Sequence, residues 1–276
     1  MVFEIKELLD AMCYLFYVAR GRKPWTLGYH TAKRRQIEKA IDTGSLKPGS
    51  VLHAGYGFRL DERVIEYPWV YSRLSKRPGL MLDAGSALNY GFLLKRPPVC
   101  EANLSICTLA PEKRCYWRRG ISYVFDDLRS SRFRSGAFDT IVSISTIEHI
   151  GLNNTLLYTT NEAKKENDSV GFRHAVRELR RIIRPGGECF ITLPYGKATM
   201  RGWFQVFDAE MVRMVLEDFQ STHQEIEYFG YSADGWHAVN PDALSEATCF
   251  DIHQDEKYGT DFAAFARGLV CMRLVA

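Results

Sequence analysis

The chain has 276 residues, of which 46% are hydrophobic and 25% charged, and its formal net charge is +3. This composition is that of a folded protein with a substantial core, and the length suits one core domain with an extension. The small net charge gives no reason to expect a nucleic-acid partner. Basic residues are concentrated in residues 19–35, and we interpret them as the solvated face of a helix. The alternative is that they bind an anionic substrate or a phosphate-bearing partner.

Seven cysteines are scattered along the chain without a CxxC pair. Such a set predicts a reducing compartment, and therefore a cytoplasmic protein, and it offers no zinc framework. Cys249 and His253 have helical ligand spacing but lack a second pair of ligands. Asp251, Asp255 and Glu256 could hold magnesium, but nothing places them near a pocket. We therefore expect no metal site.

Residues 1–77 are expected to form a helical extension and residues 78–276 the main domain. The apolar run 11–19 follows acidic residues, which is the wrong flank for a signal peptide, and it is far too short to span a bilayer. An amphipathic helix is expected here, which packs either on the domain or on a second copy of it. The formation of a homo-oligomer is therefore one of the alternatives. Further helices are expected over residues 31–41 and 62–74, the latter started or interrupted by Pro68.

From Gly79 onward, short apolar runs alternate with helical patterns. Near-continuous apolar runs of this length are typical of strands buried on both faces of a parallel sheet. An amphipathic helix, capped by Asp168 and stopped by Pro185–Gly187, precedes the last of these runs. The resulting βαβ pattern predicts an open α/β sheet. The expected strands are LMLDAG, NLSICTLA, ISYVF, FDTIVSIS and ECFITLP.

The stretch GLMLDAGSALNYG ends the first expected strand. In open α/β sheets a ligand lies beyond the carboxyl ends of the strands. The loop is not a dinucleotide fingerprint, because Ala87 and Asn89 stand where glycines would be expected. Asp83 would repel a diphosphate but suits an amino group or a positive centre, and Gly85 would let the backbone approach a ligand closely. From these residues alone, the alternative interpretation is a strand-to-helix turn that binds no ligand.

Three segments in this order and spacing resemble the class I S-adenosylmethionine-dependent methyltransferases: LMLDAGSALN, FDTIVSISTIEHIG and ELRRIIRPGGECFITLP. The similarity covers roughly residues 80–194 and, more loosely, the final ARGLVCMRL, but not the N-terminal extension. The resemblance implies an α/β fold with a Rossmann-like, mostly parallel seven-stranded sheet flanked by helices, here with an N-terminal helical extension. It also implies S-adenosylmethionine as cofactor and S-adenosylhomocysteine as product.

The resemblance further implies a cofactor site. The loop that begins at Asp83 and Gly85 would hold the amino-acid end of the cofactor, and Asp127-Leu128 would lie near the adenine amino group. No carboxylate stands at the end of the second strand to grip the ribose, and Glu112 is the nearest candidate. A capping or turn role for Asp126 and Asp127 is the alternative. The whole implied set is Asp83, Ala84, Gly85, Ser86, Ala87, Asn89, Glu112, Asp126, Asp127, Leu128, Ser145 and Thr146.

Methyl transfer from a sulfonium is an in-line displacement on an already activated carbon. The protein must align the acceptor, exclude water and, for a hydroxyl acceptor, remove a proton. His149, in the segment STIEHIG, is the predicted base, and Glu148 would tune or orient a neighbouring group. A structural role for His149, closing the cofactor pocket, is the alternative.

Two aromatic loops, residues 194–208 and 228–240, are expected to provide the acceptor site. Loops at the top of a sheet often carry specificity, and aromatic faces stack on sugars and rings. Buried aromatic residues that anchor the helix expected over residues 208–219 are the alternative. The predicted substrate contacts are Tyr195, Trp203, Gln205, Trp236 and His237.

These observations predict a cytoplasmic S-adenosylmethionine-dependent methyltransferase of a small polar acceptor, with O-methylation of a sugar or similar molecule as the leading reaction. N- or C-methylation of a small molecule and a non-catalytic, ligand-binding regulatory relative are the alternatives. A nucleic-acid methylase is disfavoured, because STIEHIG lacks the NPPY-like signature of base methylation and no RNA-binding module is evident. No membrane partner is expected.

Overall fold

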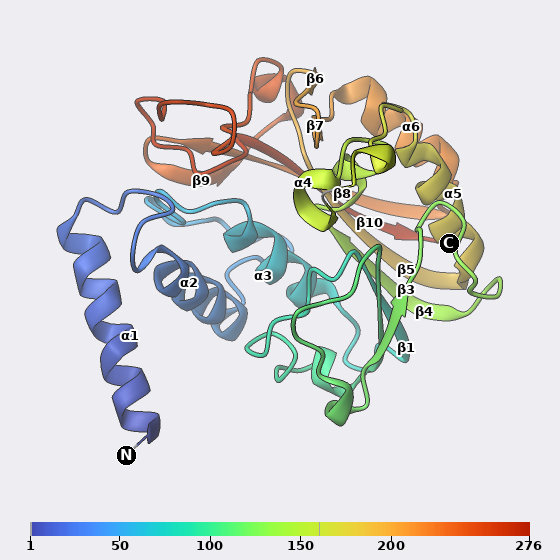
Figure 1. The fold of residues 1–276 in the computed structure, drawn as a ribbon, viewed down its shortest axis with the longest axis horizontal. Helices are drawn as coiled ribbons and strands as arrows, with labels where there is room; N and C mark the ends of the chain where they lie inside the picture. Colours follow the sequence, from blue (N-terminus) through green and yellow to red (C-terminus); the bar gives the residue numbers. More distant parts are fainter. Residues whose placement is uncertain (1, 160) are drawn as a thin grey trace. The chain divides into compact units, whose positions relative to one another are not determined.

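The computed structural model describes residues 2–159 and 161–276 (Figure 1). The chain divides into two compact units, one made of Met1–Arg73 with Tyr228–Leu269, the other of Leu74–Glu227 with Val270–Ala276. We call them the split unit and the sheet unit. The expected division after residue 77 stays a prediction, because compactness groups Tyr228–Leu269 with the N-terminal helices instead.

The eight-stranded sheet has the order β3-β2-β1-β4-β5-β10-β8-β9. The pairs β1–β2, β1–β4, β2–β3 and β4–β5 are parallel, while β8 and β9 are antiparallel. The predicted α/β fold with a Rossmann-like, mostly parallel sheet is confirmed. The expected number of seven strands is wrong, because the short β9 adds a hairpin partner to β8. The strands are β1 (Leu80–Ala84), β2 (Asn103–Thr108), β3 (Ser122–Phe125), β4 (Phe138–Ile144), β5 (Ile183–Pro194), β8 (His223–Ser232), β9 (Gly235–Ala238) and β10 (Gly268–Val275).

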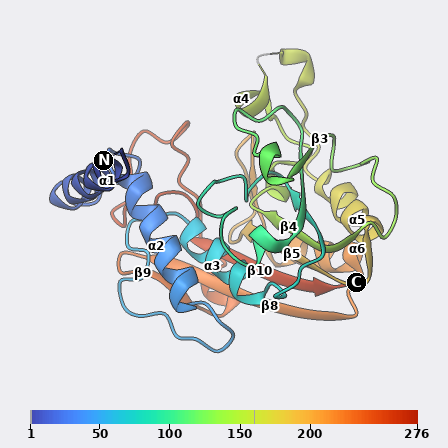
Figure 2. The ribbon, with the colours of Figure 1, turned by 90° about the horizontal axis from the view of Figure 1, so that it is seen from below.

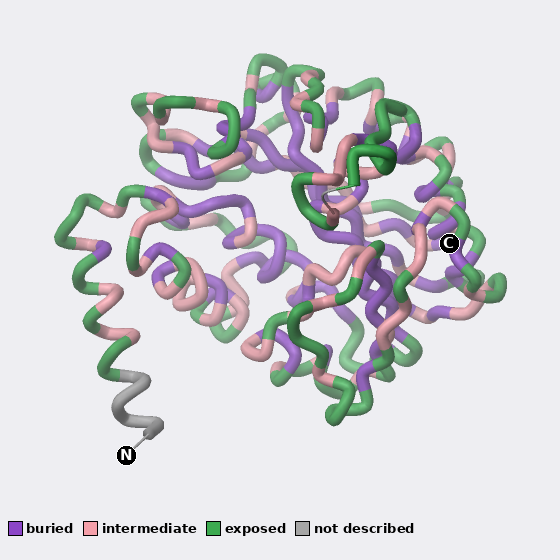
Figure 3. The backbone as a smooth tube through the Cα atoms, viewed as in Figure 1, coloured by how far each residue is buried: buried purple, intermediate pink, exposed green. Residues whose placement is uncertain are grey.

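The central strands of the sheet unit are buried on both faces (Figure 3). Met81 in β1 lies beside Leu104 of β2, and Leu82 lies beside Ile141 of β4. Because both faces are covered, the sequence cannot alternate between apolar and polar residues, and the runs are almost continuously apolar. Burial also raises the pKa of the Cys107 thiol to about 12, so this thiol is inert.

Helices α5 (Phe172–Ile182) and α6 (Ala209–Phe219) lie side by side (Figure 2) and are joined by a two-bond contact between Arg173 and Asp218. Two expectations about α5 are wrong. Asp168 does not cap the helix; its carboxylate accepts from the amide of Val170 in the preceding turn, and the N-cap is Gly171. The stop comes before Pro185–Gly187, because β5 already begins at Ile183.

The predicted N-terminal helices are confirmed in the split unit as α1 (Val2–Ala19), α2 (Tyr29–Thr43) and α3 (Arg63–Arg73), and Pro68 lies inside α3. Among the described residues, no helix is both long enough and apolar enough to cross a bilayer. The remaining elements are α4 (Thr155–Tyr158), β6 (Thr199–Met200), β7 (Gln205–Val206) and the 3₁₀ helices η1 (Val99–Glu101), η2 (Trp117–Arg119), η3 (Ile147–His149), η4 (Glu162–Lys164) and η5 (Pro241–Leu244).

Candidate active site

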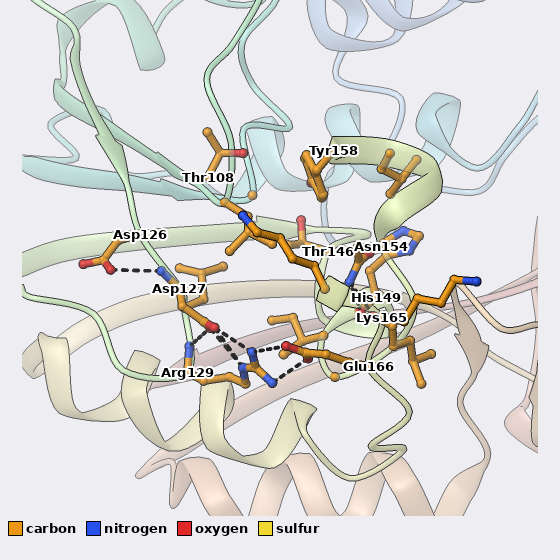
Figure 4. A pocket seen from close by; sticks show the side chains of 18 of the residues that line it. Thr108, Asp126, Asp127, Arg129, Thr146, His149, Asn154, Tyr158, Lys165 and Glu166 are labelled. Atoms are coloured by element: carbon orange, nitrogen blue, oxygen red, sulfur yellow. Dashed lines mark hydrogen bonds and ion pairs between the residues drawn. The ribbon is translucent and has the colours of Figure 1, made fainter. Parts of the chain in front are cut away.

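A cavity of about 500 Å³ lies in the sheet unit where the strand order reverses. The chain pairs β2 with one side of β1 and β4 with the other side. Such a reversal leaves a crevice outside the carboxyl ends of the strands, where ligands of open α/β sheets bind. The strand ends contribute Gly85 after β1, Thr108 and Leu109 at β2, Asp126, Asp127, Leu128 and Arg129 after β3, and Ser145, Thr146 and His149 after β4 (Figure 4).

Asp83, the predicted contact for a charged ligand tail, is fully buried at the end of β1. Its carboxylate accepts hydrogen bonds from the backbone amides of Ala87 at 3.1 Å and Leu88 at 2.8 Å. These bonds hold the loop after β1 in its turn, as acidic side chains commonly do in loops. Among the described residues that line the cavity, Gly85 is the one member of this loop.

Gly85 has a φ of +116°, and its backbone packs against the loop that follows β4. A Cβ at this position would overlap the hydroxyl and methyl of Thr146 and lie 2.7 Å from the Thr146 Cβ. Contact between two loops of the protein therefore already requires glycine here. Ser86 at φ 65° and Ser145 at φ 38° are also left-handed. Strained backbone of this kind concentrates at functional sites, where the surrounding structure holds it in place.

Two other predicted cofactor contacts lie outside the cavity lining. The Asn89 side chain donates to the Arg114 carbonyl at 3.0 Å and accepts from the Tyr123 hydroxyl at 2.8 Å, so it fastens one loop to another. Glu112, which was the nearest carboxylate to the end of β2, is also absent from the lining residues. At the end of β2, the residue that lines the cavity is Thr108.

The residues after β3 line the cavity, and a cation already engages Asp127. Arg129 donates to both carboxylate oxygens of Asp127 and, at 2.7 and 2.8 Å, to both oxygens of Glu166. We call this arrangement the Arg129 bridge (Figure 4). Burial alone would raise the pKa of Asp127, but the hydrogen bonds from Arg129 outweigh burial and lower it. Asp127 is therefore charged at neutral pH. The sequence analysis missed Arg129 and Glu166, although Arg129 follows Asp127 and Leu128 directly.

His149 ends the 3₁₀ turn η3 and lines the cavity. Its Nδ1 lies 2.8 Å from the carbonyl oxygen of Trp203, and its ring stacks on Trp203 with centroids 5.1 Å apart. A carbonyl only accepts, so Nδ1 carries the proton in the neutral ring and Nε2 keeps a lone pair. Glu148 is buried, with one oxygen 3.8 Å from Nε2. The Trp203 contact favours the tautomer in which Nε2 can act as a base, and the Glu148 carboxylate lies beside that same nitrogen.

The predicted substrate contacts do not gather at the cavity. Gln205 is buried and donates to the Ser169 carbonyl at 3.1 Å, and Tyr195 is buried beside Phe207. Trp203 reaches the site indirectly, through its stack on His149. The other two, Trp236 and His237, belong to β9 in the split unit. Trp236 is buried there and donates to the Leu60 carbonyl at 3.0 Å. Tyr195 and Trp236 therefore serve the internal packing of their units, whereas His237 is exposed.

The segment that follows η3 forms a wall of the cavity that the sequence analysis missed. Asn154 donates to the carbonyl of His149 at 2.7 Å, and Tyr158 and Thr108 both line the cavity. Glu166 closes the segment through the Arg129 bridge. The segment is polar and its helices are very short, so no periodic pattern indicated its place.

Comparisons with known proteins show similarity at the level of solved structures. The sequence matches no family model and no curated protein. The Burkholderia thailandensis 1,6-didemethyltoxoflavin-N1-methyltransferase is 10% identical with a TM-score of 0.42, over 72% of this chain and 71% of that chain. The N-methyltransferase NodS from Bradyrhizobium japonicum WM9 is 17% identical with a TM-score of 0.40, over 72% and 78%. The CurJ carbon methyltransferase is 11% identical with a TM-score of 0.44, over 98% and 66%.

Proposed function

We propose that this chain is an S-adenosylmethionine-dependent methyltransferase that acts on a small polar acceptor. The observation that carries the proposal is the cavity of about 500 Å³ at the strand-order reversal, with His149 on its wall. A ligand cavity of this size, with a few convergent polar groups at a topological switch point, is the expected form of an active site in this fold. The nature of the cofactor rests on the sequence resemblance.

The residues present fit such a cofactor. Gly85, Leu128 and Thr146 combine bare backbone, an apolar side chain and a hydroxyl around one cavity. The side-chain oxygen of Asn154 is buried and has no hydrogen-bond partner among the described residues, so it can accept from an N–H or O–H of a ligand. When bound, the cofactor would supply an activated methyl group. The protein would then have to orient the acceptor, exclude water and take up a proton.

The finer part of the proposal is that the acceptor atom is a hydroxyl oxygen, of a sugar or a similar small molecule. His149 supports it, because the Trp203 carbonyl fixes Nδ1 as the donor, so that Nε2 is the ring nitrogen that would take up the proton of the hydroxyl as its oxygen attacks. The stack on Trp203 holds the ring plane. Transfer to nitrogen or carbon would use the same cavity with less need for this base.

Calorimetry with S-adenosylmethionine and S-adenosylhomocysteine tests the cofactor, and a micromolar Kd is expected for both. Mass spectrometry of products over sugars, phenols and amines then tests the reaction. His149→Ala should lower kcat for a hydroxyl acceptor about 100-fold and leave the Kd of S-adenosylhomocysteine within about twofold. Absence of binding would refute the proposal. Binding without turnover on any acceptor would instead favour the non-catalytic relative.

A further inference from the structure

Helix α1 has an inner face that packs against α2 within the split unit. Tyr17 is buried and meets the ring of Tyr29 edge-on, with centroids 6.1 Å apart. Asp10 pairs with Arg34 of α2, and the guanidinium of Arg35 lies 4.9 Å from the centroid of the Tyr14 ring. These contacts fix which side of α1 faces the protein.

The opposite face of α1 carries large apolar side chains that are exposed. Large apolar side chains that remain this exposed on one helical face mark an interaction site rather than a solvated surface. At about 100 Å² for each side chain they form a patch of roughly 500 Å². The residues and their exposed fractions are Leu8 62%, Leu9 54%, Met12 58%, Leu15 65% and Phe16 41%.

The spacing of this face fits another helix. Leu8, Met12 and Leu15 are separated by four and three residues, and the sequence extends this alternation to Ile5 and Ala19. A repeat of three and four is the pattern of a helix that packs along a second helix by knobs into holes. The 18 residues of α1 give a seam of about 27 Å.

The charges along α1 indicate which partner the seam fits. Positions 4, 6 and 7 toward its N-terminal end are two acidic residues and one lysine, and Asp10 is already paired with Arg34 on the inner face, whereas Arg20, Arg22 and Lys23 follow its C-terminal end. Antiparallel pairing of two copies about Met12 would bring position 20 of one chain opposite position 4 of the other. Opposite charges then meet at both ends of the seam, whereas parallel pairing would bring like charges together.

We propose that α1 pairs antiparallel with α1 of a second copy of this chain, through the face that carries Leu8, Met12 and Leu15. Two patches of roughly 500 Å² bury about 1,000 Å² in total, which is at the lower end for a specific interface. The dimer should therefore form with a micromolar Kd. The acidic half of the helix disfavours an anionic membrane surface as the occupant.

Sedimentation velocity of the full chain from 1 to 200 μM tests the proposal, and a dimer with a micromolar Kd is expected. Leu15→Glu should raise the dimer Kd about 100-fold or more, because it places a carboxylate in the centre of an apolar seam. Leu27→Glu is the matched control, since Leu27 is 62% exposed but lies outside α1, and it should leave the Kd unchanged. Circular dichroism and the Tm confirm that both variants fold.

Charge reversal tests the direction of the pair. Arg20→Glu should weaken the dimer about tenfold, and Arg20→Glu combined with Glu4→Arg should restore it. A chain that is monomeric at all concentrations, or equal Kd values for the Leu15 and Leu27 variants, would overturn the proposal. Failure of the double variant to recover would overturn the antiparallel arrangement. A monomer that floats with phosphatidylserine vesicles in a Leu15-dependent way would assign the face to a membrane and would also overturn it.

Discussion

The two compact units of this chain are built in different ways. The sheet unit is almost continuous in sequence, and its strands β1 to β5 are held by parallel backbone pairing, with one irregularity between Phe138 and Thr140 of β4. The split unit joins two segments far apart in the chain through single hydrogen bonds, among them the backbone bond from Trp236 to Tyr56 and side-chain bonds to backbone carbonyls. Trp25 donates to Ala264 across 239 positions, Tyr258 to Pro24 across 234, and Trp236 to Leu60 across 176. Backbone pairing in a buried sheet is accompanied by a recognisable run of apolar residues in each strand, whereas a single hydrogen bond between distant residues has no such sequence pattern.

This difference explains why Trp236 was predicted as a substrate contact. An aromatic residue in a polar loop has the same appearance in sequence whether it faces a ligand or fills a core. Trp236 fills the core of the split unit: it is 2% exposed and stacks obliquely on Tyr231 at 5.4 Å. Measurements of stability and activity on the same Trp236 variant distinguish a core residue from a residue that contacts a ligand.

Trp236→Ala is expected to give the largest effect. Removal of a fully buried tryptophan leaves a cavity and an unpaired carbonyl at Leu60, so the free energy of unfolding should fall by about 3–5 kcal/mol. Urea denaturation followed by circular dichroism measures the change. His237→Ala is the control, because His237 is the exposed neighbour on β9, and it should change the stability by less than about 0.5 kcal/mol. Unchanged stability of the Trp236 variant would contradict its place in the core.

Gly85→Ala tests the sheet unit at the point where two loops meet. The added Cβ meets Thr146 and the residue is held at φ +116°, so the free energy of unfolding should fall by about 2–4 kcal/mol. Gly120→Ala separates backbone strain from steric overlap, because Gly120 has φ +75° with nothing within 4 Å of the added Cβ. That variant should lose only about 1 kcal/mol. Equal losses in thermal or urea unfolding would show that the contact with Thr146 does not matter.

Glu62 makes the stability of the split unit dependent on pH. It is buried and accepts from the Ala266 amide at 3.3 Å, and burial, followed by the charges of Asp61 and Glu66, raises its pKa to about 8. Because the folded pKa exceeds the ordinary value of 4.5, the folded state binds more protons between these values. The stabilisation from protonated Glu62 is therefore complete below about pH 4.5 and is lost as the pH rises through about 8.

Glu62→Gln should remove this dependence, because the amide keeps the shape of the protonated acid without titrating. The difference in unfolding free energy between pH 5 and pH 8 should be smaller in the variant than in the wild type, measured by urea denaturation at several pH values. Asp61 does not interfere in this range, since Lys33 overcomes the effect of burial and lowers the pKa of Asp61 below its ordinary 3.8. Parallel pH profiles for the two proteins would contradict a protonated Glu62.

Much of the sheet unit could be predicted from the sequence, because a strand that is buried on both faces consists of a continuous run of apolar residues. The same runs located the cavity, since strand ends gather on one edge of a parallel sheet. The individual contacts could not be predicted. Asp83 binds its own loop and Asn89 binds a neighbouring loop, which a carboxylate or amide in a turn does as readily as it binds a ligand. The eighth strand, β9, was missed because four residues are too few for a period.

The wall after η3 belongs to the sheet unit, but it is held by side-chain hydrogen bonds and not by the backbone pairing that holds the strands. Glu166 is 39% exposed in its side chain and binds Arg129 through two hydrogen bonds. Exposed pairs contribute little to stability, so Glu166→Gln should change the free energy of unfolding by less than about 0.5 kcal/mol. The variant should nevertheless weaken the binding of S-adenosylhomocysteine about two- to fivefold, because the bridge positions the wall against Asp127.

Calorimetry of the variant and of Glu162→Gln decides whether the bridge acts on the cavity. Glu162 lies in the same wall and also pairs with a cation, Lys165, but its side chain is 71% exposed and it makes no bond to the loop after β3 among the described residues. Its variant should bind the ligand as the wild type does. If both variants bind equally well, the wall is positioned without the bridge, for instance by the Asn154–His149 hydrogen bond, and the Arg129 bridge is a surface ion pair without influence on the site.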